Sequence, residues 1–369
     1  MAFNPVTATG SVTLEIDHTK IDATLTNFPI AIKLSSLATG MYAALGANNL
    51  KMAVTSSDGT TQYPVEIECW ESGNQVIHTQ IPSISSTVDT EVEVFWDSTQ
   101  DDNSTYVGVT GSTPAKTVWD SDFIAVYHMA QDPSAGGACI LDSTSNSNHG
   151  TPYGSMLTED LVNADVGKAI SADGTDDYIA CGSILNLGDN DLVATLELLS
   201  TNDKMRISTE RTTSSGLGSA VFWAMESGYL KYLRGDLSST PYSHTITASS
   251  LLAANQNNYF AFVSNGASTA RTFWTNTDKY TEVLNFTYTD AGFSNIELFR
   301  HRNYTYGTEY TAMTCASARL SSVARSDAWA KATNYSLKDT LLSVHGAQIE
   351  ILKPKCLFII NSFPLLEGV

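Results

Sequence analysis

The stretch TEVEVFW, Thr90 to Trp96, decides the fold class, because its residues alternate between two faces. One face carries two valines and Trp96, and the other carries two glutamates and Phe95. A period of two predicts a strand that is buried on one side only, as in a β-sandwich. The same alternation recurs in Val12 to Ile16 and in Ile30 to Leu34, and turn-forming residues separate the segments. The sequence therefore predicts an all-β protein.

A polar stretch with little apolar periodicity, residues 98–116, divides the chain. A length of 369 residues suits two domains. We expect a small β-sandwich over residues 1–97, a linker over 98–116 and a second antiparallel β-domain over 117–340. Within this second domain, Ser321 to Lys338 is expected to contain a helix, with Ser326 as its N-cap.

A C-terminal extension, residues 341–369, follows the second domain. It carries apolar patches that Pro354 and Pro364 interrupt, so we expect extra strands at an edge or an interface. One hypothesis is that the extension packs against the first domain or another subunit and helps to build a homo-oligomer. The alternative is that it pairs within the second domain as a final strand.

The charge balance excludes two classes of partner. The chain has 39 acidic and 20 basic residues and a formal net charge of −19. An acidic surface repels phosphate backbones and anionic lipid headgroups, so we expect no nucleic-acid binding. No apolar run approaches the roughly 18 residues of a membrane helix, so no membrane insertion is expected.

The cysteines and the first residues bear on the compartment. Five scattered cysteines without a C-x-x-C pair favour folding in a reducing cytosol. The opening segment MAFNPVTATGSVTLEID lacks the basic and apolar regions of a secretory signal.

Two strand-like segments carry closely spaced carboxylates, which glycoside hydrolases use in pairs. LEIDHTK contains Glu15 and Asp17, and VEIECWE contains Glu66, Glu68 and Glu71. Neither segment has the spacing of an assembled acid and nucleophile. We expect a solvent-facing row of glutamates on an amphipathic strand, no catalytic residue and no enzymatic activity.

Two other groups of residues are candidates for ligand binding. Asp and Asn oxygens beside glycines suit Ca²⁺, although turn formation explains them equally well, and the candidate metal ligands are Asp142, Asp173, Asp176 and Asp177. Aromatic side chains stack on sugar rings or pack within strands, and the candidate carbohydrate-binding residues are Tyr229, Tyr232, Tyr304 and Tyr306. No nucleotide-binding motif occurs, so no cofactor is expected beyond a possible Ca²⁺.

Five blocks of the second half resemble the laminin-G-like, concanavalin A-like jelly roll of bacterial surface and phage proteins. The blocks are TVWDSDFIAVYHMAQD (117–132), LDSTSNSNHGTP (141–152), VGKAISADGTDDYIACG (166–182), NNYFAFVSNGASTARTFWTN (257–276) and ARLSSVARSDAWAKATNYS (318–336). The resemblance implies an antiparallel jelly roll. Many relatives hold Ca²⁺ through an acidic pair just before the closing strand, where this chain has Ala316 and Ser317, so the resemblance does not carry over that site.

The first half resembles a small β-domain of unknown function that often precedes such jelly rolls. LTNFPIAIKLSS (25–36), SSDGTTQYPVEIECWESG (56–73) and IPSISSTVDTEVEVFW (81–96) follow its pattern. The combination occurs in virion and bacterial surface proteins. It implies a phage tail fibre, tail spike or capsid decoration protein that folds in the host cytoplasm, with other virion subunits and host-surface glycans as partners. The alternatives are a carbohydrate-binding module of a secreted or cell-surface polysaccharide-processing protein and, third, a glycoside hydrolase.

Overall fold

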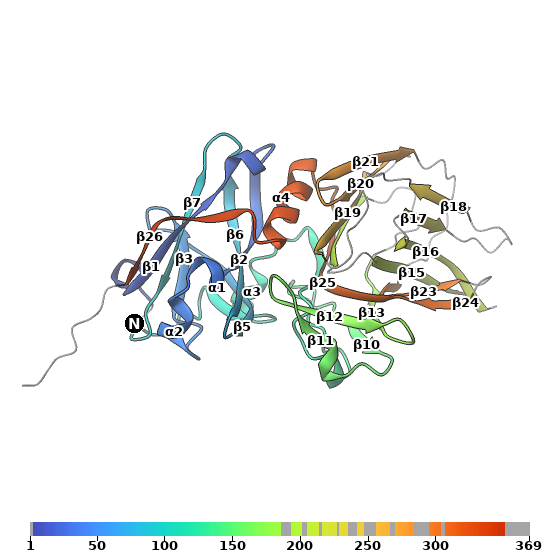
Figure 1. Ribbon diagram of the computed structural model, residues 1–369, viewed down its shortest axis with the longest axis horizontal. Coiled ribbons are helices and arrows are strands. Elements are labelled where there is room, and N and C mark those ends of the chain that lie inside the picture. Colours follow the sequence, from blue (N-terminus) through green and yellow to red (C-terminus); the bar gives the residue numbers. More distant parts are fainter. Residues whose placement is uncertain are drawn as a thin grey trace, which may run out of the picture.

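The computed structural model describes residues 3–185, 193–200, 205–213, 216–226, 229–234, 242–246, 256–265, 270–283, 295–303 and 307–350 (Figure 1). Two bodies of β-sheet lie side by side, the first with strands from residues 10–109 and 342–350 and the second with strands from residues 123–321. The prediction of an all-β fold built from antiparallel sandwiches is confirmed. In the described part of the chain, no helix has the length and apolar character needed to cross a bilayer.

Two sheets form the first domain. The five-stranded sheet has the order β26 (Leu342–Glu350), β1 (Gly10–Ile16), β7 (Thr90–Trp96), β3 (Met52–Ser56), β4 (Gln62–Tyr63). The four-stranded sheet has the order β2 (Leu25–Lys33), β6 (Asn74–Ile84), β5 (Val65–Glu71), β8 (Val107–Val109). Short helical turns connect them: η1 (Pro5–Thr7), η2 (His18–Lys20), α1 (Leu34–Leu37) and α2 (Met41–Leu45).

The core of this domain follows from the alternation seen in the sequence. The apolar residues of β1 and β7 are buried at every second position, and Leu14 and Trp96 are among the largest fully buried side chains. Gly10 permits this packing, because a Cβ atom there would lie 2.2 Å from the Trp96 indole. The two sheets therefore close on one apolar layer.

The range expected to be a linker contains regular structure. Its strand β8 pairs in parallel with β5, placing Val107 opposite Val65, and the helix α3 (Thr113–Lys116) follows. The side-chain amide of Asn103 (Nδ2) donates a hydrogen bond to the Met52 carbonyl at 2.9 Å. These contacts attach the segment to the first domain.

Two larger sheets form the jelly roll. The seven-stranded sheet has the order β10 (Thr151–Tyr153), β13 (Tyr178–Ser183), β22 (Asn295–Leu298), β15 (Met205–Thr213), β16 (Gly216–Glu226), β17 (Tyr229–Arg234), β18 (Tyr242–Ile246). The eight-stranded sheet has the order β11 (Leu161–Asn163), β12 (Lys168–Asp173), β25 (Ala312–Ser321), β14 (Val193–Ser200), β19 (Asn258–Asn265), β20 (Ala270–Thr275), β21 (Asp278–Val283), and β9 (Phe123–Tyr127) pairs with β25. The remaining elements are the hairpin β23 (Arg300–Asn303) and β24 (Gly307–Tyr310), with η3 (Pro133–Ala135) and η4 (Thr158–Asp160).

The eight-stranded sheet is buried on both faces. Along β14, Leu196 and Leu198 point into the jelly-roll core, whereas Leu199 belongs to a second cluster on the opposite face. That second cluster also includes Ala31 and Val76 of the first domain. The two domains therefore share an apolar interface.

The predicted helix lies at this interface as α4 (Asp327–Leu337), between the two bodies of sheet in Figure 1. Ser326 is its N-cap as expected, accepting a hydrogen bond from the Trp329 amide at 3.2 Å. The Trp329 ring packs edge-on against Phe28, and the Ala31 amide donates to Ser336 Oγ at 2.8 Å. The helix thus belongs to the jelly roll in sequence but packs on the first domain.

After α4 the chain returns to the first domain. Strand β26 pairs antiparallel with β1, with Leu342 opposite Ile16 and Ser343 opposite Glu15. Figure 1 shows β26, at the red end of the colour scale, beside β1. The described part of the C-terminal extension is therefore an edge strand of the first domain and not a final strand of the jelly roll.

Candidate functional site

Strand β5 carries two buried glutamates, which corrects the expectation of a solvent-facing row. Glu66 is fully buried, and the side chain of Glu68 is 5% exposed. The alternation along β5 is as predicted up to a bulge between Ile67 and Cys69. The face opposite the first domain's core is covered, because the jelly roll packs against it.

Four donors surround the Glu66 carboxylate. Oε2 accepts from Trp119 Nε1 at 2.5 Å and lies 3.3 Å from His128 Nε2. Oε1 accepts from Ser143 Oγ and from Thr110 Oγ1, both at 2.7 Å. Burial raises the pKa of Glu66, but the charge of His128 and the hydrogen bonds from His128, Ser143 and Thr110 outweigh it, so the pKa is lowered overall. A carboxylate of the first domain is thus held by donors from residues 98–116, the connecting segment, and from the jelly roll.

Glu68 and two histidines form the second part of this network. Glu68 Oε2 lies 2.6 Å from His78 Nε2 and 3.5 Å from His128 Nδ1. Burial raises the pKa of Glu68 to about 7, with Glu66 adding to the rise and His128 opposing it. Burial also lowers the pKa of His78 well below its usual value, and the nearby charges of His128 and Arg319 add to this effect. The contact between the domains therefore contains a carboxyl group that titrates near neutral pH.

A buried cation completes the network. Arg319 of β25 lies opposite Glu197 of β14 in the sheet register, and its guanidinium carbon is 5.1 Å from the centre of the Trp119 ring. Glu197 Oε1 accepts from the Tyr259 hydroxyl at 2.6 Å. Burial lowers the pKa of Arg319, against the opposing effect of the surrounding carboxylates. This cation offsets part of the negative charge of the three buried glutamates.

The donor set of Glu68, His78 and His128 is one that binds transition metals, and its ligand atoms lie within 4.8 Å of one another. The two imidazole rings, however, stack at a centroid distance of 4.1 Å with planes 19° apart. A histidine lone pair lies in the plane of its ring, so two nearly parallel rings do not direct their nitrogens at one ion. In this arrangement Glu68 bridges the two imidazoles through a hydrogen bond with His78 and a 3.5 Å contact with His128.

The candidate calcium ligands fall into two separate places. Asp142 is fully buried, and its two oxygens accept from the amides of Val126, Thr144 and Asn148 and from Thr144 Oγ1, at 2.8–2.9 Å. Four donors saturate this carboxylate, so it organises the turn. It is not part of the group formed by the other three aspartates.

Asp173, Asp176 and Asp177 are brought together in the turn between β12 and β13, with carboxylate oxygens within 4.8 Å of one another. Asp177 is buried and accepts from the Asp173 amide at 3.0 Å. Burial raises the pKa of Asp177, and the carboxylates of Asp173, Asp160 and Asp176 add to the rise. Asp173 and Asp176 are exposed.

Of the four candidate carbohydrate-binding tyrosines, the structure describes the backbone of two. Tyr229 and Tyr232 lie on β17, opposite Glu226 and Trp223 of β16, and their side chains lie outside the described part of the structure. Tyr304 and Tyr306 lie outside the described residues.

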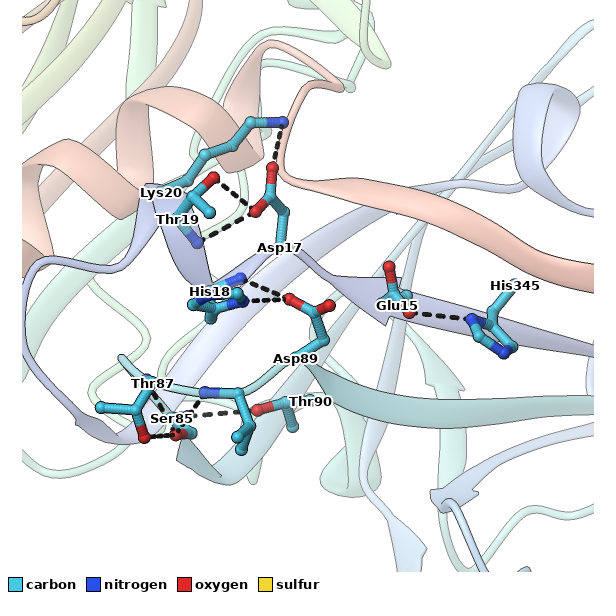
Figure 2. Close-up of polar contacts among 11 residues, drawn as sticks. Glu15, Asp17, His18, Thr19, Lys20, Ser85, Thr87, Asp89, Thr90 and His345 are labelled. Carbon is cyan, nitrogen blue, oxygen red and sulfur yellow. Dashed lines mark hydrogen bonds and ion pairs between the residues drawn. The ribbon is translucent and has the colours of Figure 1, made fainter.

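Two polar contacts at the surface of the first domain contrast with the buried network (Figure 2). His18 Nδ1 lies 2.6 Å from Asp89 Oδ1, and His345 Nδ1 of β26 lies 2.8 Å from Glu15 Oε2 of β1. The second contact joins the C-terminal strand to its neighbour.

The comparison with known proteins gives remote structural similarities only. No family model and no curated protein matches the chain. The receptor-binding domain of a botulinum neurotoxin C/D mosaic serotype matches with 11% identity over 56% of this chain and 49% of its own, with a TM-score of 0.37. Domain 4 of AbnA, an extracellular GH43 arabinanase from Geobacillus stearothermophilus, was solved with arabinotriose. It matches with 14% identity over 60% of this chain and 98% of its own length, with a TM-score of 0.42. The botulinum neurotoxin serotype D binding domain matches with 9% identity over 60% of this chain and 52% of its own length, with a TM-score of 0.40.

The fold assignment accordingly depends on strand order and register. These define a two-domain β-protein in which a jelly roll is packed on a smaller β-sandwich. The histidines and Trp119 of the network were not among the candidate site residues predicted from the sequence. The sequence did carry one indication of this network. Glutamates alternate with apolar residues along β5, and the neighbouring strand β6 places His78 opposite Glu66.

Proposed function

We propose that this chain is a non-enzymatic structural and binding protein, in which the first domain is an adaptor and the jelly roll meets a partner surface. The observation that carries the proposal is the hydrogen bonding of Glu66 to Trp119, Ser143 and His128 across the domain contact. A buried network of this kind fixes the orientation of the jelly roll on the adaptor. Such a rigid mount suits a protein that is built into an assembly.

The assembly that we propose is a virus particle, with the chain serving as a tail fibre, tail spike or capsid decoration protein. Besides the resemblance of the sequence to such proteins, the state of the thiols supports this setting. The four described cysteines, Cys69, Cys139, Cys181 and Cys315, are unpaired, as expected for folding in a reducing host cytoplasm.

Mass spectrometry of purified particles from the source tests this proposal. We expect the chain in the particles at a fixed copy number relative to the major capsid protein. Its absence from the particles, or its recovery from the secreted fraction of uninfected cells, would overturn the virion assignment and favour a carbohydrate-binding module.

The surroundings of Glu66 and Glu68 support the absence of hydrolytic activity. Both carboxylates are engaged in hydrogen bonds and lie beneath the jelly roll, out of reach of a polysaccharide. We expect no release of reducing sugar from β-glucans. Release that disappears in Glu66→Gln or Glu68→Gln would show that the strand is catalytic.

The position of β26 in its sheet supports a homo-oligomer. Among the described strands, β26 pairs with β1 on one side and is the last strand of its sheet on the other, and it exposes Val344 and Ile349. An edge strand with exposed apolar side chains is a site for pairing with another chain. Light scattering on the full chain and on a chain that ends at residue 341 tests this. An unchanged oligomer in a folded truncation would rule out this edge as the interface.

A further inference from the structure

A ladder of flat side chains lies at one edge of the jelly roll. Tyr153 of β10 and Tyr178 of β13 are register partners, and their rings stack at a centroid distance of 4.7 Å with planes 7° apart. The guanidinium carbon of Arg300 lies 3.2 Å from the centre of the Tyr178 ring. At that distance it occupies the face of Tyr178 that Tyr153 does not cover.

The inner end of the ladder is fixed in place. Arg300 is buried, and its Nε donates to Glu297 Oε2 at 2.8 Å in a two-point ion pair. The rings of Tyr310 and Tyr178 lie with their centroids 6.4 Å apart. Because the guanidinium is already paired, its charge is largely neutralised for an incoming ligand.

The outer end of the ladder is open. Tyr153 is 46% exposed although one of its faces is stacked on Tyr178. Among the described residues, no further ring or cation stacks on it. A tyrosine braced in this way presents a rigid apolar surface, so little side-chain freedom is lost when a ligand stacks on it.

An acidic turn packs against the residue that follows Tyr153. Gly154 follows Tyr153 with φ +91°, and a Cβ atom on it would lie 2.6 Å from Asp177 Oδ1 and 2.7 Å from the Asp176 carbonyl oxygen. The turn that carries Asp173 and Asp176 is therefore in contact with the segment that carries the ring. Both of these carboxylates are exposed, and carboxylates accept hydrogen bonds from hydroxyl groups.

We propose that Tyr153, supported by Tyr178, binds a neutral glycan together with Asp173 and Asp176 of the adjoining turn. This assignment rests on the proposed binding role of the jelly roll. A pyranose ring has an apolar C–H face that stacks on an aromatic ring and hydroxyl groups that donate to carboxylates. The clustered carboxylates and the net charge of −19 repel anionic sugars.

An organic cation is the competing ligand, since an aromatic ring beside carboxylates also attracts positive charge. The geometry favours the sugar for two reasons. Arg300 already occupies one face of Tyr178, and among the described residues no ring or cation stacks on the outer face of Tyr153. A cation is bound tightly by an enclosing cage of rings, whereas a single flat platform suits the face of a sugar.

The test measures binding of the full chain to a panel of neutral oligosaccharides, with EDTA present so that no divalent cation contributes. We expect at least one neutral glycan to bind, and Tyr153→Ala to weaken it by about tenfold or more through loss of the ring contact. Tyr153→Phe keeps the ring and retains most of the affinity. Asp176→Ala weakens binding less than Tyr153→Ala.

Tyr106→Ala is the matched control, because Tyr106 is a comparably exposed tyrosine (37%) on the connecting segment. Equal affinity of Tyr153→Ala and the wild type would overturn the site while leaving the proposed function in place. Failure of the wild type to bind any neutral glycan, or binding of tetramethylammonium alone, would overturn the choice of ligand. The virion assignment is tested separately by the particle composition.

Discussion

Strand β5 and the turn between β12 and β13 carry the same kind of side chain in opposite surroundings. On β5, Glu66 and Glu68 are covered by the second domain and engaged by Trp119, His78 and His128. In the turn, Asp173 and Asp176 face solvent. Burial therefore decides what a carboxylate does in this protein. The covered pair joins two domains, whereas the exposed pair is available to a ligand.

The largest expected effect is that of removing the central acceptor of the buried network. Glu66→Ala leaves the donors of Trp119 and Ser143 without their acceptor in a buried site. We expect a loss of about 3–5 kcal/mol in the free energy of unfolding, measured by denaturant titration. Glu91→Ala, on the exposed face of β7, is the control. A loss below about 1 kcal/mol would show that the network contributes little to stability.

The second prediction concerns pH and Glu68. A folded-state pKa of about 7, above the ordinary value of 4.5, means that the folded chain binds this proton more tightly than the unfolded chain does. The resulting stability is present at low pH and is lost as the pH rises through 7. His78 acts in the opposite direction, because its lowered pKa reduces stability as the pH falls below 6.5.

Comparing Glu68→Gln with the wild type isolates the carboxyl group, since both chains retain His78. Between pH 5 and 8 the stability of the wild type should fall relative to that of the variant, by up to about 1.4 kcal/mol per pH unit. Denaturant titrations at several pH values measure the difference. Parallel curves for the two proteins would contradict the assignment.

A third, smaller effect tests the packing of the acidic turn on the tyrosine ladder. Gly154→Ala introduces a Cβ atom 2.6 Å from Asp177 Oδ1 at a backbone angle that favours glycine. We expect a loss of about 1–3 kcal/mol in stability and weaker glycan binding. Gly136→Ala is the control, because Gly136 also has a positive φ but no atom within 4 Å of the added group. Equal losses in the two variants would show that backbone strain alone is responsible.

The smallest effect is expected for a surface ion pair. His345→Ala removes the contact between β26 and Glu15 shown in Figure 2, where the imidazole is 57% exposed. Because water screens such pairs, we expect a change of about 0.2–1 kcal/mol that shrinks in high salt. A double-mutant cycle with Glu15→Gln measures the coupling. A coupling as large as the loss in Glu66→Ala would remove the distinction between buried and exposed carboxylates.

Local pattern was enough to predict an all-β chain with strands such as β1 and β7, the helix, and part of the acidic turn. The alternation of β1 and β7 reports which face is apolar, and Ser326 caps α4 through a bond to a residue three positions away. The grouping of Asp173, Asp176 and Asp177 also follows from their nearness in the chain. These features depend on neighbours in sequence, so they can be read from it.

The sequence alone was enough to predict an all-β chain and a capped helix, because strand periodicity and capping are short-range properties. Only the tertiary structure decided that Glu66 is buried, since its partner Ser143 lies 77 residues away. It also decided that β26 pairs with β1 and that Tyr153 stacks on Tyr178. An alternating strand shows one apolar face and one polar face, and nothing in that pattern states whether the polar face meets water or another domain.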